Sequence, residues 1–208
     1  MTSADDLEVP GSSAAGPSEL GFSTRAIRAA SHAPEVHQRP TSAPIYQTAT
    51  FASLDAEELA TVVADSRAGF SYSRLSNPTT TALGDAYAAL AGAEAGVALA
   101  SGMGAIHAAC AALLGAGDRV VAPLAGYGST RAQLVGYFGR FGVEVALVDM
   151  TDHDAVAGAL AERPTRLLYA ETSANPTTLI SDHVALAELA HRAEAVYVVD
   201  NTFASTYV

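Results

Sequence analysis

Short apolar runs rich in β-branched residues recur from residue 97 onward, and stretches with helical spacing lie between them. Five such runs predict strands, at 97–100, 120–122, 143–148, 167–170 and 196–199. The segments between them have about the length that a helical crossover between parallel strands needs. This alternation predicts an α/β protein with a mostly parallel sheet and helices on both of its faces.

Two further helices are predicted ahead of the first strand. Asp55 and Glu58 fit a capping box at the start of one helix. That helix carries four apolar residues on one side: Leu54, Leu59, Val62 and Val63. Asn77 as N-cap and Pro78 at the first helical position open the second helix.

Composition divides the chain into three parts. Residues 1–21 are rich in Ser, Ala, Gly, Pro and acid without apolar periodicity, which predicts a disordered tail. Residues 22–69 predict an extended, Pro-punctuated arm and the first helix, and residues 70–208 predict the α/β domain. A loop-like stretch follows the strand that ends at Asp200, so we expect the amino-terminal portion of a longer protein.

The charge balance narrows the choice of partners. Acidic residues number 22 and basic residues 11, a formal charge of -11, so the chain repels a polyphosphate backbone and nucleic acid is not expected. No signal peptide or membrane span is predicted, and the single cysteine, Cys110, fits a reducing cytoplasm. The six histidines show no spacing typical of metal ligands, so no metal is expected.

A glycine-rich turn at Ser101–Gly104 follows the first predicted strand and opens a helix. Backbone N–H groups and the helix dipole converge at such a place, so the turn could bind a phosphate, although it could equally bring helix and sheet close together. Gly102 and Gly104 imitate a dinucleotide motif, but the motif's third glycine and the acidic residue after the next strand are missing. A nicotinamide-binding oxidoreductase therefore remains the weaker alternative.

Polar residues also follow the later predicted strands. Tyr127 and Asn175 lie in loops after strands, and Asp200 ends one, at the edge of the sheet where α/β proteins bind ligands. We expect an apolar setting for the Asp200 carboxylate, which is costly unless an opposite charge meets it. Tyr72 and Arg74 lie two apart in an extended segment, so both face one side and could grip a phosphate.

Six short blocks, taken together, resemble one family of enzymes. In chain order they are PIYQTATF at 44–51, YSRLSNPTT at 72–80, SGMGAI at 101–106, YGST at 127–130, ETSANPT at 171–177 and VVDNTF at 198–203. This set is similar to the Cys/Met-metabolism family, the transsulfuration enzymes that depend on pyridoxal 5'-phosphate (PLP). The family includes cystathionine γ-synthase, cystathionine γ-lyase, methionine γ-lyase and the homoserine-ester sulfhydrylases. The resemblance implies the large domain of a type I, aspartate aminotransferase-like PLP enzyme, truncated here.

The resemblance also implies which residues hold PLP: Tyr72, Arg74, Ser101, Gly102, Met103, Tyr127, Asn175 and Asp200. Gly102 and Met103 would give backbone N–H groups to the phosphate. Tyr127 would stack on the ring and assist proton transfer, and Asn175 would bond the ring oxygen. Asp200 would keep the ring nitrogen protonated, which makes the ring an electron sink for a substrate carbanion. Tyr127 and Asp200 are thus the expected catalytic residues.

The family pattern further implies a homo-oligomer, and it includes a catalytic lysine that this chain lacks. Tyr72 and Arg74 would reach the phosphate of a neighbouring subunit, so a homo-oligomer, a dimer of dimers, is expected. The family forms a Schiff base on a lysine in a loop beyond the DNTF block, whereas all 11 basic residues of this chain are Arg. The substrate would be a homoserine ester, cystathionine or methionine. We expect this chain alone to be inactive, and a lysine-free, non-catalytic relative or assembly partner is the alternative.

Overall fold

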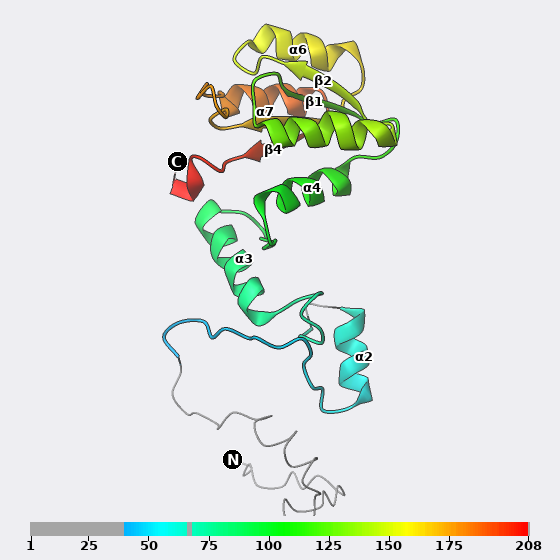
Figure 1. The fold of residues 1–208 in the computed structure, drawn as a ribbon, viewed down its shortest axis with the longest axis vertical. Coiled ribbons are helices and arrows are strands. Elements are labelled where there is room, and N and C mark those ends of the chain that lie inside the picture. The colour runs from blue at the N-terminus through cyan, green and yellow to red at the C-terminus, as the bar shows by residue number, and fades with distance from the viewer. Residues whose placement is uncertain (1–39, 66–67, 208) are drawn as a thin grey trace, which may run out of the picture. The chain divides into compact units, whose positions relative to one another are not determined.

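The computed structural model describes residues 40–65 and 68–207, and Ala43–Val208 forms one unit. The predicted tail at 1–21 and the first part of the arm lie outside the described residues. A four-stranded sheet follows the order β2-β1-β3-β4, and every neighbouring pair is parallel (Figure 1). Its strands are β1 (Arg119–Pro123), β2 (Glu144–Val148), β3 (Leu167–Glu171) and β4 (Val196–Asp200).

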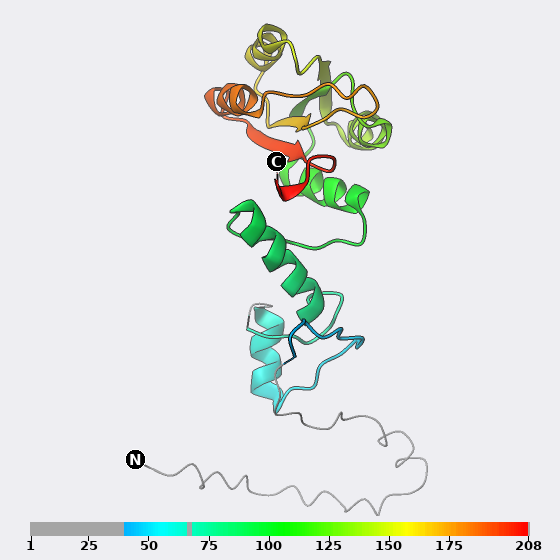
Figure 2. The same ribbon diagram turned by 90° about the vertical axis from the view of Figure 1, so that its left-hand side faces the viewer.

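Helices cover both faces of the sheet, as the alternating pattern predicts (Figure 2). On one face, α6 (His153–Glu162) and α7 (His183–Arg192) pack on a core that includes Val121 and Leu168. On the other face, α4 (Gly102–Leu113) and the segment after α5 (Gly128–Arg131) pack on Val120 and Tyr169. Neighbouring residues of one strand thus point to opposite faces, as the pleat requires. The segment after α5 comprises a π-helix, η1 (Ala132–Tyr137), and a 3-10 helix, η2 (Phe138–Phe141).

One predicted strand is wrong. Residues 97–100 follow the β-branched pattern, but they pair with no strand among the described residues, and Val97 is 82% exposed. A run with strand propensity becomes a strand only where a neighbour satisfies its N–H and C=O groups. Just before this run, Gly96 packs against Gly84, where an added Cβ on either residue would lie within 2.5 Å of the other's carbonyl oxygen.

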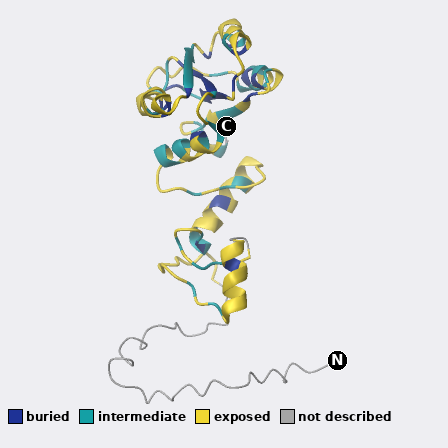
Figure 3. Cartoon of the chain, turned by 90° about the vertical axis from the view of Figure 1, so that its right-hand side faces the viewer, coloured by how far each residue is buried: buried dark blue, intermediate teal, exposed yellow. Residues whose placement is uncertain are grey.

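The two early helices begin where the capping residues predict. In α2 (Ala56–Ala64) the Asp55 carboxylate accepts from the N–H groups of Glu57 and Glu58. The α3 helix (Pro78–Ala91) begins with Asn77 as N-cap and Pro78 in its first turn. Burial is concentrated in the sheet and the helices that cover it (Figure 3). Of the four apolar residues predicted on one side of α2, only Val62 is buried, and Leu54 precedes the helix. The chain ends in a short 3-10 turn, η3 (Ser205–Tyr207). No helix within the described residues is both long and apolar enough for a membrane span.

Candidate active site

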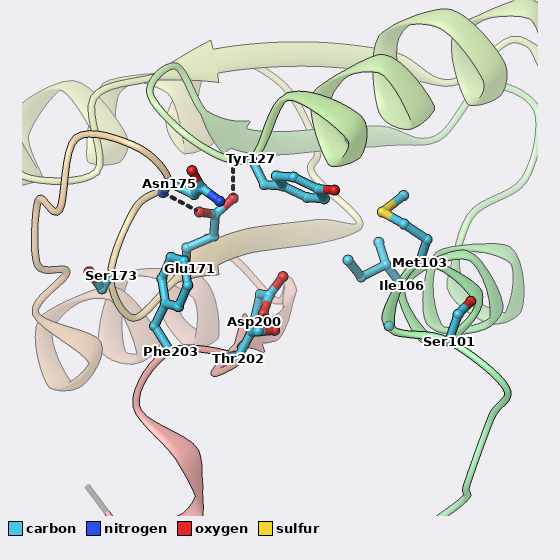
Figure 4. Close-up of a pocket in the computed structure, with 11 residues that line it drawn as sticks. Ser101, Met103, Ile106, Tyr127, Glu171, Ser173, Asn175, Asp200, Thr202 and Phe203 are labelled. Atoms are coloured by element: carbon cyan, nitrogen blue, oxygen red, sulfur yellow. Dashed lines mark hydrogen bonds between the residues drawn. The ribbon is translucent and has the colours of Figure 1, made fainter.

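A cavity of about 420 Å³ lies where the carboxyl ends of β3 and β4 meet the start of α4 (Figure 4). This volume falls in the range of small-molecule sites, and the place is the strand-end position that α/β proteins use for ligands. Its walls are formed by Ser101, Gly102, Met103, Ile106, Tyr127, Glu171, Ser173, Asn175, Asp200, Thr202 and Phe203. Six of the eight residues expected to hold a cofactor are therefore brought together.

The start of α4 presents unpartnered N–H groups at one end of the cavity. Ser101 is the N-cap, and its hydroxyl accepts from the Gly104 N–H at 3.0 Å. The Ser101 carbonyl accepts from Ala105. The N–H groups of Gly102 and Met103 have no acceptor among the described residues, so they and the positive end of the helix dipole remain available to an anion.

Asp200, the last residue of β4, presents a carboxylate whose two oxygens are both fixed. The Tyr169 hydroxyl donates to Oδ2 at 3.1 Å, and the Thr202 N–H donates to Oδ1 at 3.0 Å. The Thr202 hydroxyl also donates to Oδ1. The expectation of an apolar setting is thus wrong, because three donors meet this carboxylate. Burial and the charge of Asp200 raise the pKa of the Tyr169 phenol well above its usual value, so the phenol remains a donor.

Glu171, the last residue of β3, joins the two loops that carry Tyr127 and Asn175. Its side chain is buried, with 5% of the residue exposed, and Oε1 accepts from the Tyr127 N–H at 2.6 Å. Oε2 accepts from the Asn175 N–H at 3.0 Å (Figure 4). One carboxylate therefore sets the spacing between two residues expected to contact the cofactor ring.

Glu171 is not among the predicted site residues, although the sequence carries a signal for it. The strand LLYAE ends in a carboxylate, as the neighbouring strand VYVVD does, and Glu171 pairs in register with Asp200. Parallel strands in register bring such end residues to the same edge of the sheet. The Tyr127 ring and the Met103 side chain face the cavity above and beside Asp200 (Figure 4).

Tyr72 and Arg74 lie outside the residues that line the cavity. Tyr72 forms an isolated antiparallel bridge with Thr50, and the Arg74 guanidinium lies 5.4 Å from the centre of the Tyr72 ring. The two side chains therefore share one side of the segment, as their spacing predicts. Within this chain they do not contribute to the cavity.

The charge distribution across the cavity defines the ligand that fits it. The helix start at Gly102 favours an anion, whereas Glu171 and Asp200 place carboxylates at the opposite end. A flat face is offered by Tyr127 between them. A ring that carries a phosphate on one side and a protonated nitrogen on the other matches all three features. The residues present therefore fit PLP.

Comparisons with known proteins agree with this geometry. Residues 23–208 match the family model described as Cys/Met metabolism PLP-dependent enzyme. An L-methionine gamma-lyase from Pseudomonas putida is 43% identical over 188 residues, which cover 90% of this chain and 47% of that protein. A cystathionine gamma-synthase from Mycobacterium tuberculosis is 40% identical over 185 residues, covering 89% of this chain and 45% of that protein.

Solved structures similar to this chain belong to the same group of enzymes. A putative O-acetylhomoserine (thiol)-lyase from Campylobacter jejuni, which contains N'-pyridoxyl-lysine-5'-monophosphate, has a TM-score of 0.77 at 30% identity over 85% of this chain and 43% of its own. MetB from Corynebacterium glutamicum has a TM-score of 0.75 at 38% identity over 92% of this chain and 47% of its own.

The chain spans about half the length of the curated relatives it matches. The sequence, the fold and the cavity all nevertheless agree with this family. The type I fold and the PLP cofactor follow from the match to the family model and to the solved structures. The chain belongs to the Cys/Met-metabolism family of PLP-dependent enzymes.

Proposed function

We propose that this chain is the amino-terminal, cofactor-binding portion of a carbon–sulfur lyase or γ-replacement synthase of sulfur amino-acid metabolism. Its substrate class is a homoserine ester, cystathionine or methionine. The observation that carries the proposal is the polarity of the cavity, with free N–H groups at the start of α4 and the Asp200 carboxylate opposite them. A dinucleotide, the alternative suggested by the glycine-rich turn, finds no such support.

Each wall of the cavity has a separate task in this proposal. Gly102 and Met103 bind the phosphate through backbone N–H groups, and Asp200 accepts a hydrogen bond from the protonated ring nitrogen. Tyr127 covers one face of the ring and lies ready to move a proton, while Asn175 bonds the ring oxygen. When bound, PLP supplies an electron sink for a carbanion formed next to it.

The amine that would anchor PLP covalently must come from outside these 208 residues, because none of them is Lys. The chain alone is therefore inactive in this proposal, although it binds PLP without a covalent bond. The same absence supports a second candidate, a lysine-free relative that binds PLP or an assembly partner without catalysis. An in-frame Ser/Thr-rich loop with a lysine in the sequence downstream of Val208 would favour the first candidate, and a stop codon would favour the second.

Removing one N–H at the start of α4 should weaken PLP binding by roughly 30-fold, the size expected for a lost hydrogen bond to a charged group. Gly102→Pro removes this donor at the first helical position, where proline is tolerated, and Ser101 already has the extended backbone that precedes a proline. Binding to the full chain is measured by equilibrium dialysis, with pyridoxal, which lacks the phosphate, as the second ligand.

Gly102→Ala is the matched control, because it keeps the N–H and its Cβ meets no atom within 4 Å apart from the neighbouring residues and the backbone of its own helix. Equal PLP affinity in wild type and Gly102→Pro would contradict the phosphate role of this N–H.

Borohydride should fix no PLP to any side chain, and peptide mass mapping should find an adduct only at the α-amino group of Met1. A stoichiometric adduct on a side chain would refute non-covalent binding.

Tyr72 and Arg74 point to a homo-oligomer, since they lie together on a partly exposed segment outside the chain's own cavity. In this part of the proposal they complete the phosphate site of a neighbouring subunit. Arg74→Ala should then weaken PLP binding by roughly 30-fold through the partner, as expected when a charged hydrogen bond is lost.

Mixed oligomers test this role. A subunit with Arg74→Ala is paired with a subunit with Asp200→Asn, which puts both defects in one site and leaves the other site intact. Half of the sites should then bind PLP with wild-type affinity, as measured by titration of the isolated hybrid. If the hybrids contain no high-affinity site, Arg74 does not act across an interface.

A further inference from the structure

The proposed chemistry does not use His183, whose ring lies between Tyr197 of β4 and Thr172 just after β3. It is the first residue of α7, and its ring is partly buried. Nδ1 lies 2.6 Å from the Tyr197 hydroxyl of β4, and Nε2 lies 2.9 Å from the Thr172 hydroxyl just after β3. Thr172 in turn bonds the side chain of Asn201, which follows Asp200. We call these four residues, Tyr197, His183, Thr172 and Asn201, the His183 network.

The partners at the far end of the network fix the direction of every hydrogen bond in it. The Asn201 side-chain N–H donates to the Ser205 carbonyl, which can only accept, so Asn201 Oδ1 faces Thr172. The Thr172 hydroxyl has one proton and donates it to that oxygen at 2.6 Å. It must therefore accept from His183 Nε2, so Nε2 carries the ring proton. In the neutral ring Nδ1 then accepts from the Tyr197 hydroxyl.

The network ends on the corner that carries Asp200. The Asn201 carbonyl accepts from the N–H groups of Ala204 and Ser205, which closes the turn 201–205. The Thr172 N–H donates to the Asp200 carbonyl at 3.0 Å, so Thr172 holds this corner by backbone as well as by side chain. Among the described residues, His183 forms no hydrogen bond with Asp200 or with a residue that lines the cavity. Its effect on the site must pass through Thr172 and Asn201.

Two features favour the neutral ring. Burial lowers the pKa of His183, although the Asp182 carboxylate partly opposes this change. The ring stands at the positive end of the α7 dipole, where a cation is unfavourable. The titratable groups that face it are the Tyr197 phenol from β4, whose own pKa is raised by burial, and Asp182, which caps the helix through the Ala185 N–H.

We propose that neutral His183 is a positioning residue, which acts through Thr172 and Asn201 to hold the corner 200–205 so that Asp200 faces the cofactor ring. Protonation adds a hydrogen at Nδ1, reverses the bond to Tyr197 and places a charge at a helix start. The Nε2–H bond to Thr172 persists, but the charged ring moves away from the helix start and from Tyr197 and thereby displaces Thr172. The corner then loosens, and PLP affinity falls as pH decreases through the titration of His183. This inference rests on the proposed function for the identity of the ligand, but not for the hydrogen-bond order.

The hydrogen-bond order is tested on the full chain without any ligand. We expect ¹⁵N NMR to show a proton on Nε2 and none on Nδ1 of His183 at pH 7.5, and this signal to titrate below the usual histidine value. Thr172→Val, which removes the hydroxyl at nearly constant volume, should change the tautomer ratio. A ring protonated at Nδ1 in the wild type would overturn the proposed order, whatever the chain binds.

The link to the site is tested with variants that keep or remove the bonds. His183→Gln offers an amide N–H to Thr172 and an oxygen to Tyr197 but does not titrate, so it should keep PLP affinity within about twofold at pH 7.5. His183→Leu breaks both bonds and should lower affinity about tenfold at every pH, in the range for a broken hydrogen-bond network. Thermal unfolding is recorded for each variant.

The decisive comparison is the pH profile of PLP affinity between pH 8 and pH 5.5. PLP titrates itself in this range, but its own titration affects wild type and His183→Gln equally. Because His183 titrates below the usual histidine value, only part of the rings are protonated at the acidic end, so wild type should lose about threefold more affinity than His183→Gln there. Parallel profiles would overturn the positioning role, whereas failure of wild type to bind PLP at any pH would contradict the proposed function instead.

Discussion

Changing Asp200 to Asn should slow exchange of a substrate's α proton by about a thousandfold in the complete enzyme that we propose. A thousandfold change corresponds to about 4 kcal/mol, the size of a lost charge that stabilises the electron sink. The fold should survive, because the Asn oxygen still accepts from Thr202 and the Asn N–H can donate to the Tyr169 hydroxyl, which then accepts. Loss of function is thus expected without loss of structure.

Exchange is measured by NMR in deuterated water, with thermal unfolding of the same samples in parallel. In the 208-residue chain the corresponding readout is the preference for PLP over an analogue in which a C–H replaces the ring nitrogen. Wild type should show this preference and Asp200→Asn should not. Normal exchange in the variant would refute the electron-sink role. A large loss of stability with exchange preserved would leave Asp200 as a cap for the turn that begins at Thr202.

Glu171→Ala should lower the free energy of unfolding by about 4 kcal/mol and lower PLP affinity at the same time. The change leaves the partly buried N–H groups of Tyr127 and Asn175 without their acceptor, and each such group costs about 1–3 kcal/mol. The two loops also lose the carboxylate that fixes their spacing. Urea unfolding followed by circular dichroism measures the first effect, and equilibrium dialysis measures the second.

Two controls separate the bonds from the charge. Glu171→Gln keeps one acceptor oxygen and should cost roughly half as much, since one N–H still finds a partner. Glu188→Ala removes an exposed carboxylate that lies 3.7 Å from Arg192, and should change stability by less than about 0.5 kcal/mol. If Glu171→Ala is as stable as Glu188→Ala, the carboxylate does not hold the two loops.

The predicted strands are present wherever a neighbouring strand pairs with the predicted segment. The runs at 120–122, 143–148, 167–170 and 196–199 are short, apolar and rich in β-branched residues, which is the signal that the prediction used, and each of them lies in a strand of the sheet. The run at 97–100 carries the same local signal. Its backbone nevertheless finds no strand partner among the described residues, and pairing is a property of two segments rather than one.

In the candidate site, too, some residues could be predicted from the sequence and others could not. Ser101, Gly102 and Asp200 were predictable, because helix starts and strand ends bind ligands by virtue of position alone. The supports of Asp200 were not predictable, since Tyr169 lies on the neighbouring strand and contacts Asp200 only through the register of β3 and β4. The place of Tyr72 and Arg74 in an assembly stays a prediction.

The cavity draws its walls from parts of the chain that are far apart in sequence, with Gly102 at one end and Asp200 at the other. A ligand that bridges them acts as a reversible cross-link between the start of α4 and the ends of β3 and β4. Because it binds only the folded form, PLP at a hundred times its Kd adds about 2.7 kcal/mol to the free energy of unfolding. For a chain that spans half of its relatives' length, the supply of cofactor thereby becomes a determinant of how much folded protein a cell maintains.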